Sequence, residues 1–176
     1  MKRLAMLALV LAFGMSCDDS PTGPSDPNVA RFTAILLPSN EVPAITNADA
    51  AASGTMQLTM TVTRDAANNI TGATYDFVVN FTGFPANTTL TGAHIHNGAV
   101  GANAGVVVGL PLTATDTAVP TGQGSITKTQ LPSTSATVTP AAVAQNIFNN
   151  PPGNYFNVHT TLNGGGAIRG QLVRAN

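Results

Sequence analysis

Three observations predict an all-β fold, a Greek-key β-sandwich or barrel of about eight short strands with one short helix. The chain is rich in Thr and Val, which favour the pleated surface of a sheet. It also holds 17 glycines and 12 prolines, which favour turns. Short apolar–polar alternations recur between these turn residues. The 176 residues fit a single domain with a core large enough to need no disulfide or metal.

The first half of the predicted domain carries the clearest strand patterns. The first strand covers residues 31–37 and ends before Pro38. Residues 55–62 and 70–82 place apolar side chains at every second position, and a DAANN segment at residues 65–69 separates them. We therefore expect a long antiparallel hairpin with one buried side.

The second half predicts a helix among further strands. Thr139 can cap this helix, Pro140 suits its first turn, and the PPG segment after Asn150 ends it. The apolar side chains between these points form one stripe, which predicts packing against a sheet. The strands expected in this half are residues 90–96, 106–112, 124–131, 155–160 and 167–173.

The N-terminal segment has the pattern of a secretion signal. Lys2 and Arg3 precede an uncharged apolar stretch, residues 4–15, which is too short for a bilayer span of about 20 residues. Cys17, the only cysteine in the chain, follows this stretch. Residues 14–17 resemble the lipobox of bacterial lipoproteins, with Gly where that motif usually has Leu. The alternative is an ordinary secretory signal with an incidental cysteine.

The segment after Cys17 favours the lipoprotein interpretation. Its sequence, DDSPTGPSDPN, is Pro-rich and cannot bury enough surface to fold, so it suits a tether. We therefore predict a signal peptide over residues 1–17, a flexible linker over 18–28 and a folded domain over 29–176. A lipid on Cys17 would anchor the domain to a membrane, on the periplasmic or outer surface.

Charge is sparse and balanced, with seven Lys and Arg against eight Asp and Glu. A nucleic-acid-binding protein needs a basic face to neutralise phosphates, so nucleic acid is not expected as a partner. The expected partners are the membrane, through the lipid anchor, and a ligand in the cell envelope or outside the cell. The sequence contains no paired Asp–His framework for a nucleophile and no phosphate-binding glycine loop, which favours a protein without catalysis.

All three histidines lie in two short motifs, AHIHNG and NVHT. Residues i and i+2 of a strand share a face, so His94 and His96 point the same way while Ile95 points to the opposite layer. His159 shares its face with Asn157 in the same manner. If the two strands are neighbours, the three imidazoles meet at one point. Such a site suits copper or zinc and leaves one coordination position open.

Two further residues complete the predicted site. Arg169, on the last strand, is expected to stand over the open position and attract an anion. Asn157 is expected to support the histidines or the anion. The alternative is that the histidines only form hydrogen bonds with turns and carbonyl groups of the sheet. Glu41, between Asn40 and Pro43, is interpreted as part of a structural bend without a chemical role.

Four motifs in order resemble those of a known family. They are NEVP at residues 40–43, AHIH at 93–96 with spaced glycines after it, YFNVHT at 155–160 and IRGQL at 168–172. Together they resemble the CHRD domain, which is named for chordin and is common in exported bacterial proteins. The resemblance extends over residues 31–173. The sequence departs from the family pattern at Ala167, where Glu is usual, and at Gly164, where Pro is frequent.

The resemblance implies an immunoglobulin-like β-sandwich or barrel with a distant likeness to copper/zinc superoxide dismutase. It also implies that His94, His96, His159 and Arg169 are similar, in chain order, to the copper-side histidines and the late active-site arginine of that enzyme. The bridging histidine and the zinc-ligand loop of the enzyme have no counterpart in the sequence. Dismutase activity is therefore not expected.

Two hypotheses of function follow. The first is a membrane-anchored, extracytoplasmic CHRD domain protein that acts as a binding or structural module without catalysis. The second is a copper- or zinc-binding or redox-protective protein that uses the three histidines. The distances among the three imidazoles distinguish the two.

Overall fold

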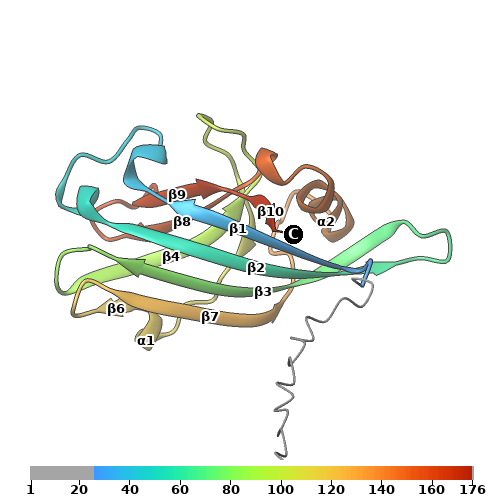
Figure 1. Ribbon diagram of the computed structural model, residues 1–176, viewed down its shortest axis with the longest axis horizontal. Coiled ribbons are helices and arrows are strands. Elements are labelled where there is room, and N and C mark those ends of the chain that lie inside the picture. Colours follow the sequence, from blue (N-terminus) through green and yellow to red (C-terminus); the bar gives the residue numbers. More distant parts are fainter. Residues whose placement is uncertain (1–25, 176) are drawn as a thin grey trace, which may run out of the picture.

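The computed structural model describes residues 26–175, and their strands form two antiparallel sheets packed face to face (Figure 1). The ten strands of this part of the chain are β1 (Val29–Leu36), β2 (Ser53–Arg64), β3 (Ile70–Thr82), β4 (Thr88–His96), β5 (Val106–Gly109), β6 (Ala118–Val119), β7 (Gly124–Leu131), β8 (Tyr155–Thr160), β9 (Ile168–Gln171) and β10 (Val173–Ala175).

The first sheet has the order β10-β1-β2-β3-β7, and the second has the order β5-β4-β8-β9 with β6 paired to β4. Neither sheet closes into a barrel within residues 26–175. The predicted all-β sandwich is therefore confirmed, with two strands more than expected.

The alternating pattern of β2 and β3 builds one wall of the core. Met56, Leu58 and Met60 of β2 are all buried, and the opposite wall comes from the second sheet. The rings of Phe77 and Phe156 meet across the two layers with their centroids 5.9 Å apart. Burial of each such side chain contributes about 1.5–3 kcal/mol, so this contact between sheets stabilises the sandwich. The predicted hairpin is confirmed, because β2 pairs with β3 along its whole length.

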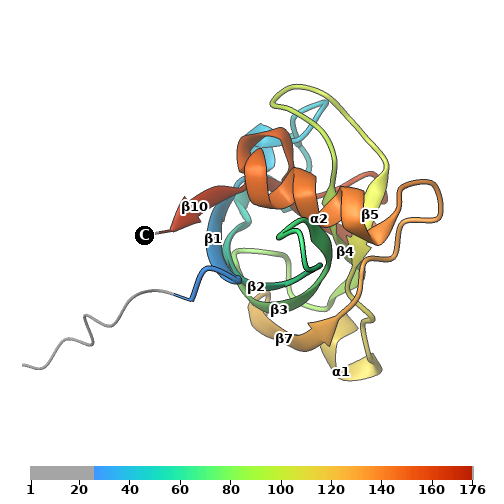
Figure 2. The same cartoon turned by 90° about the vertical axis from the view of Figure 1, so that its right-hand side faces the viewer.

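Helix α2 (Pro140–Asn149) packs on β3 and lies across one end of the sandwich, as the end-on view shows (Figure 2). Thr139 caps it by accepting a hydrogen bond from the amide of Ala142. Its apolar stripe, which includes Val143 and Ile147, is buried against the core. The helix ends before the PPG segment, as predicted, and this segment forms a short 3-10 turn, Pro151–Gly153.

The C-terminal strand differs from its prediction. The expected strand over residues 167–173 is divided at Leu172 into β9, which pairs with β8, and β10, which pairs with β1. Leu172 is fully buried between them, and its amide donates to the carbonyl of Asn154. The chain thus passes from the second sheet to the first at this residue. Periodicity alone cannot show such a change of partner.

The strand expected over residues 106–112 is also shorter than predicted. It ends at Gly109; the amide of Leu110 still donates to the carbonyl of Ala93 on β4, and Pro111 follows. The chain then forms helix α1 (Ala114–Thr117), which the sequence analysis did not predict, with Thr113 and Asp116 as a capping box.

The predicted signal peptide, Cys17 and most of the linker lie outside the described residues. Within residues 26–175, no helix is both long enough and apolar enough to cross a bilayer.

Candidate metal centre

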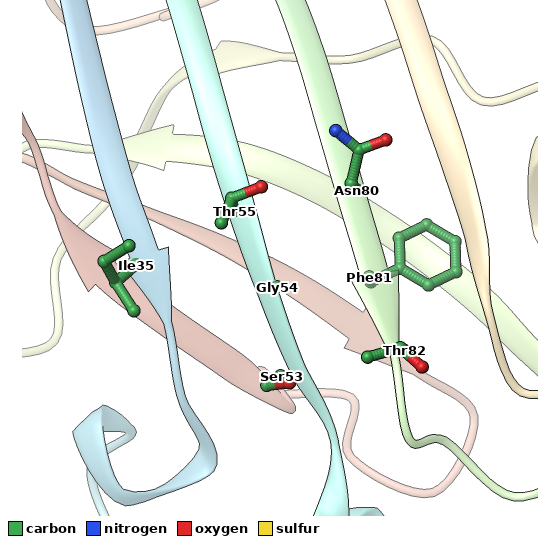
Figure 3. Close-up of a pocket in the computed structure, with 7 residues that line it drawn as sticks. All are labelled: Ile35, Ser53, Gly54, Thr55, Asn80, Phe81 and Thr82. Carbon is green, nitrogen blue, oxygen red and sulfur yellow. The ribbon is translucent and has the colours of Figure 1, made fainter.

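The outer face of the first sheet carries a hollow of about 390 Å³ (Figure 3). It holds no acidic, basic or metal-ligating side chain, so we assign it no chemistry. Its lining residues are Ile35, Ser53, Gly54, Thr55, Asn80, Phe81 and Thr82.

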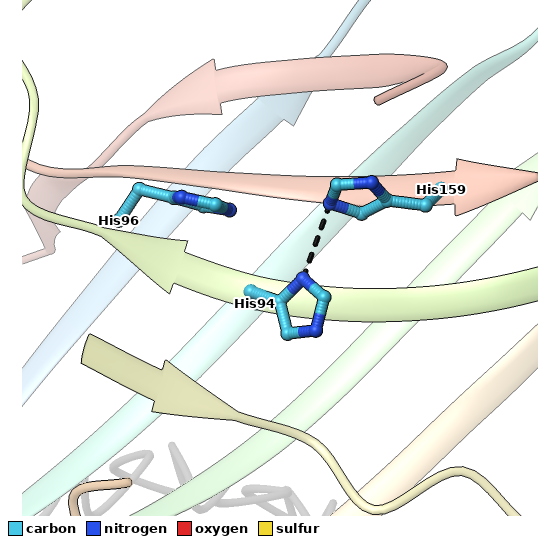
Figure 4. Close-up of side chains that lie close together, drawn as sticks. All are labelled: His94, His96 and His159. Atoms are coloured by element: carbon cyan, nitrogen blue, oxygen red, sulfur yellow. Dashed lines mark hydrogen bonds between the residues drawn. The ribbon is translucent and has the colours of Figure 1, made fainter. Parts of the chain in front are cut away.

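The three histidines lie on the second sheet and converge at one point (Figure 4). Strands β4 and β8 are antiparallel neighbours, and their register sets His94 opposite Asn157 and Gly92 opposite His159. One ring nitrogen from each of His94, His96 and His159 lies within 4.8 Å of the others. The alternate positions of the same strands, such as Ile95, enter the core. The predicted meeting of the three imidazoles is therefore confirmed.

A glycine makes room for the closest pair of rings. Nδ1 of His94 lies 3.1 Å from Nε2 of His159. A Cβ atom at Gly92 would lie only 2.5 Å from Cε1 of His94. Because Gly92 has no side chain, the ring of His94 can fold back over its own strand toward His159.

Backbone carbonyl groups determine which ring nitrogens carry hydrogen. Nδ1 of His96 lies 2.8 Å from the carbonyl oxygen of Ala104, and Nδ1 of His159 lies 2.9 Å from that of Gly164. A carbonyl oxygen only accepts hydrogen bonds, so both Nδ1 atoms must donate. In a neutral imidazole, Nε2 then carries a lone pair. Both Nε2 atoms face Oδ1 of Asn157, at 3.0 Å from His96 and 2.9 Å from His159.

The imidazoles are held in their neutral form. Burial, with smaller effects of the neighbouring His159 and His96, lowers the pKa of His94 to about 4. Burial also lowers the pKa of His96 and of His159, although the hydrogen bonds to the two carbonyls act in the opposite direction. Metal ligation requires neutral imidazole, so the three rings are in the competent form at neutral pH.

The sequence analysis expected Arg169 to stand over the imidazoles, but the structure places it elsewhere. Its guanidinium carbon lies 3.3 Å from the ring centroid of Tyr155, and the imidazole of His96 stacks on the same ring at 4.6 Å. Two groups this close to one ring must occupy its opposite faces, so the phenol separates Arg169 from the histidines. The guanidinium donates instead to Oδ1 of Asn103 and to the carbonyls of Ala99 and Ala102. Arg169 thus fastens the loop over residues 97–105.

Glu41, for which the sequence predicted only a structural bend, also lies in this region. It is 6% exposed, and its Oε1 has no hydrogen-bond partner among the described residues. Burial raises its pKa to about 7, against the opposing effects of Arg169 and Asn157. A Cβ atom at Gly166 would lie 2.4 Å from this Oε1 and 2.7 Å from Nδ2 of Asn157. Gly166, at a φ of 129°, therefore leaves the space in which Glu41 meets Asn157.

His94 also borders an open, mainly apolar groove of about 380 Å³. This is the side from which a ligand can approach the cluster, because His96 and His159 are buried while His94 is half-buried. The other residues of the groove are Val106, Gly109, Leu110, Pro111, Leu131, Pro132 and Thr134.

Comparison with known proteins identifies the family. The family model of the CHRD domain matches residues 32–172, which include the three histidines, Asn157 and Arg169. No curated protein and no solved structure matches the chain. The matched region is most of the sequence and nearly all of the sandwich. The chain therefore belongs to the CHRD domain family.

Proposed function

We propose that this CHRD domain is a non-catalytic binding module for one transition-metal ion, copper or zinc, held by His94, His96 and His159. The observation that supports the proposal most directly is the convergence of lone pairs. The hydrogens of His96 and His159 are directed to backbone carbonyls, so the lone pairs of their Nε2 atoms and of Oδ1 of Asn157 face one another, and the neighbouring Nδ1 of His94 can donate or accept according to its tautomer. A cation is the group that such a cluster attracts.

Hydrogen bonding among these side chains explains the arrangement less well than binding of a metal ion does. His94 can donate from Nδ1 to Nε2 of His159, but Nε2 of His96 then still faces the amide oxygen. Metal-ligating histidines usually donate their other ring N–H to a carbonyl or carboxylate, as His96 and His159 do here. Imidazole nitrogens suit copper and zinc among the common biological metals.

The surrounding side chains favour binding over turnover. The amide of Asn157 is not a general base, and Tyr155 contacts His96 through the face of its ring. A bound copper ion would supply one-electron redox chemistry, and a bound zinc ion would supply a Lewis acid. The chain's own part is to hold the three nitrogens in place and to exclude water from His96 and His159.

Calorimetric titration of the purified protein with Cu²⁺ and Zn²⁺ tests the proposal. We expect one ion per chain with a Kd below about 1 μM, and loss of binding in a His94→Ala/His96→Ala variant. Gln57→Ala, on the exposed face of β2, is the control and should bind as the wild type does. Absence of binding, or equal binding by the double variant, would contradict the proposal.

Fluorescence provides a second readout. The chain has two tyrosines and no tryptophan, and Tyr155 stacks on His96. Binding of Cu²⁺ at the three histidines should therefore quench part of the tyrosine emission, and a Tyr155→Phe variant should lose that quenched part.

We also propose that the module is exported and held at the cell envelope by a lipid on Cys17. The support is the sequence pattern of residues 1–28, a short apolar signal followed by a cysteine and a Pro-rich tether. Cell fractionation tests this idea. The wild-type protein should be found with the membranes and a Cys17→Ser variant in the soluble fraction, whereas an unchanged distribution would exclude an anchor at Cys17.

A further inference from the structure

We propose that the buried carboxylate of Glu41, acting through the amide of Asn157, tunes this centre for a divalent ion over monovalent Cu⁺. The inference rests on the proposed function, since it concerns the same three histidines. It makes Glu41 a positioning residue, because no ring nitrogen is its hydrogen-bond partner in the structure.

The side chain of Asn157 lies between the two buried rings, those of His96 and His159. Its side-chain oxygen lies 3.0 Å from Nε2 of His96 and 2.9 Å from Nε2 of His159. If the amide were reversed, its NH₂ group would donate to these lone pairs and compete with any cation. The direction of this one amide thus decides whether the pocket of ring nitrogens is attractive to an ion.

Glu41 is the neighbouring group that favours this direction of the amide. The opposite end of the amide, Nδ2, lies beside Glu41, and Gly166 leaves space for both groups. An ionised carboxylate only accepts hydrogen bonds, so it favours the orientation that presents NH₂ to Glu41 and the oxygen to the histidines. Glu41 has no competing partner at Oε1 within the described part of the chain. A buried acceptor without a partner is free to accept from the amide, and this is the interaction that the proposal assigns to Glu41.

The negative charge of Glu41 acts on a cation bound at the histidines. The ring nitrogens and the amide are neutral, so the proposed ligands supply no negative charge to a bound cation. Arg169 lies near Glu41 but directs its donors to the loop over residues 97–105. Coulomb interaction depends on charge and distance, so Arg169 offsets part of the charge of Glu41, and the remainder acts on the centre. Coulomb energy is proportional to the charge of the ion, so the carboxylate stabilises a divalent ion twice as much as a monovalent ion at the same position.

A Glu41→Gln variant tests the inference, because glutamine keeps the shape of the side chain and removes its charge. The affinities for Zn²⁺ and, under anaerobic reducing conditions, for Cu⁺ are measured at pH 8, where the carboxyl of the wild type is ionised. We expect the variant to bind Zn²⁺ about 10- to 100-fold more weakly, the range typical of groups that support metal ligands. The loss for Cu⁺ should be about the square root of that factor, because the Coulomb energy is halved.

The control is Asp76→Asn, which removes a carboxylate from β3, where its Oδ1 accepts a hydrogen bond from Gln130. This variant should bind both ions as the wild type does. Glu41→Gln should fold at least as stably as the wild type, because it removes a poorly paired buried carboxylate. A double variant, Glu41→Gln with Asn157→Asp, has a negative charge beside the histidines again. It should recover part of the preference for Zn²⁺ over Cu⁺.

The outcomes separate the two proposals. A wild-type protein that binds neither ion would overturn the proposed metal site itself. A wild type that binds both ions, with Glu41→Gln unchanged or weakened equally for Zn²⁺ and Cu⁺, would overturn only the role of Glu41. If Glu41→Gln does not fold, Glu41→Ala takes its place, and it must weaken Zn²⁺ more than Cu⁺ for the inference to stand.

Discussion

At the scale of single residues, two glycines determine the shape of the candidate centre. Gly92 leaves the space into which His94 turns toward His159, and Gly166 leaves the space in which Glu41 reaches Asn157. A side chain at either position would meet heavy atoms at 2.4–2.7 Å, closer than any ordinary contact. The absence of a Cβ atom is thus part of how the functional side chains are positioned.

Substitution of Gly92 should weaken metal binding. In a Gly92→Ala variant the added methyl group would meet Cε1 of His94, so the ring must turn away from His159. We expect about a 10-fold or larger loss of Zn²⁺ affinity in a calorimetric titration. Gly105→Ala is the matched control, because a Cβ atom there meets nothing within 4 Å. Equal affinities of the two variants would show that His94 does not need this space.

The hydroxyl of Tyr75 provides a test of core energetics. Tyr75 is fully buried in β3, and its hydroxyl has no hydrogen-bond partner among the residues described. A Tyr75→Phe variant should therefore be more stable by about 1 kcal/mol, which raises Tm by about 2–4 °C for a domain of this size. Thermal unfolding measures the change. A lower Tm would mean that the hydroxyl has a partner in solution.

At the scale of elements, β8 is buried on both faces for two different reasons. Phe156 and Val158 enter the core between the sheets. Tyr155, Asn157 and His159 point to the other face, which would be open in a bare sheet, yet they are also buried. The loop over residues 97–105 covers part of this face, with the carbonyl of Ala104 on His96. Arg169 of β9 donates hydrogen bonds to this loop. Strand β9 thus stabilises the loop that covers the neighbouring strand β8.

This role of Arg169 leads to a prediction for the loop. An Arg169→Lys variant keeps the charge but cannot donate in the planar fork that reaches Asn103, Ala99 and Ala102 together. We expect a loss of about 2 kcal/mol or more in the free energy of unfolding. Hydrogen exchange should become faster in residues 97–105. Arg31→Lys, at an exposed position of β1, is the control and should change neither quantity.

At the scale of the whole molecule, stability and metal binding depend on pH through the same buried groups. The three histidines have lowered pKa values in the folded chain, that of His94 about 4, so below about pH 6.5 the unfolded chain binds more protons at these rings than the folded one. Glu41 has a raised pKa of about 7, so it acts in the opposite direction between pH 4.5 and 7. Three histidines act in one direction and one glutamate in the other, so we expect the histidines to dominate the pH dependence of stability.

The metal-free protein should therefore lose stability on acidification. We expect the free energy of unfolding in urea to decrease as the pH falls from 7.5 to 5, since the unfolded chain takes up protons that the folded rings refuse. A His94→Gln variant should show a weaker dependence. For Glu41→Gln, the gain in stability over the wild type should be largest at pH 8 and should disappear near pH 4. A wild type that is equally stable at pH 5 and 7.5 would contradict the depressed pKa values of the histidines.

The sequence by itself determined the features that depend on local pattern. The alternation of Met56, Leu58 and Met60 predicted the central hairpin, and Thr139 with Pro140 predicted the start of α2. The spacing of His94 and His96, two residues apart in a strand, predicted that both rings share a face. These predictions succeed because side-chain direction in a strand and capping of a helix are set by neighbours a few residues away.

Only the tertiary structure decided which groups meet across distant parts of the chain. It directed Arg169 away from the histidines to a loop, brought Glu41 to Asn157, and divided the last strand between two sheets at Leu172. The physical reason is that a buried donor, acceptor or charge takes whichever partner the packing brings within reach, and spacing along the sequence carries no record of that partner.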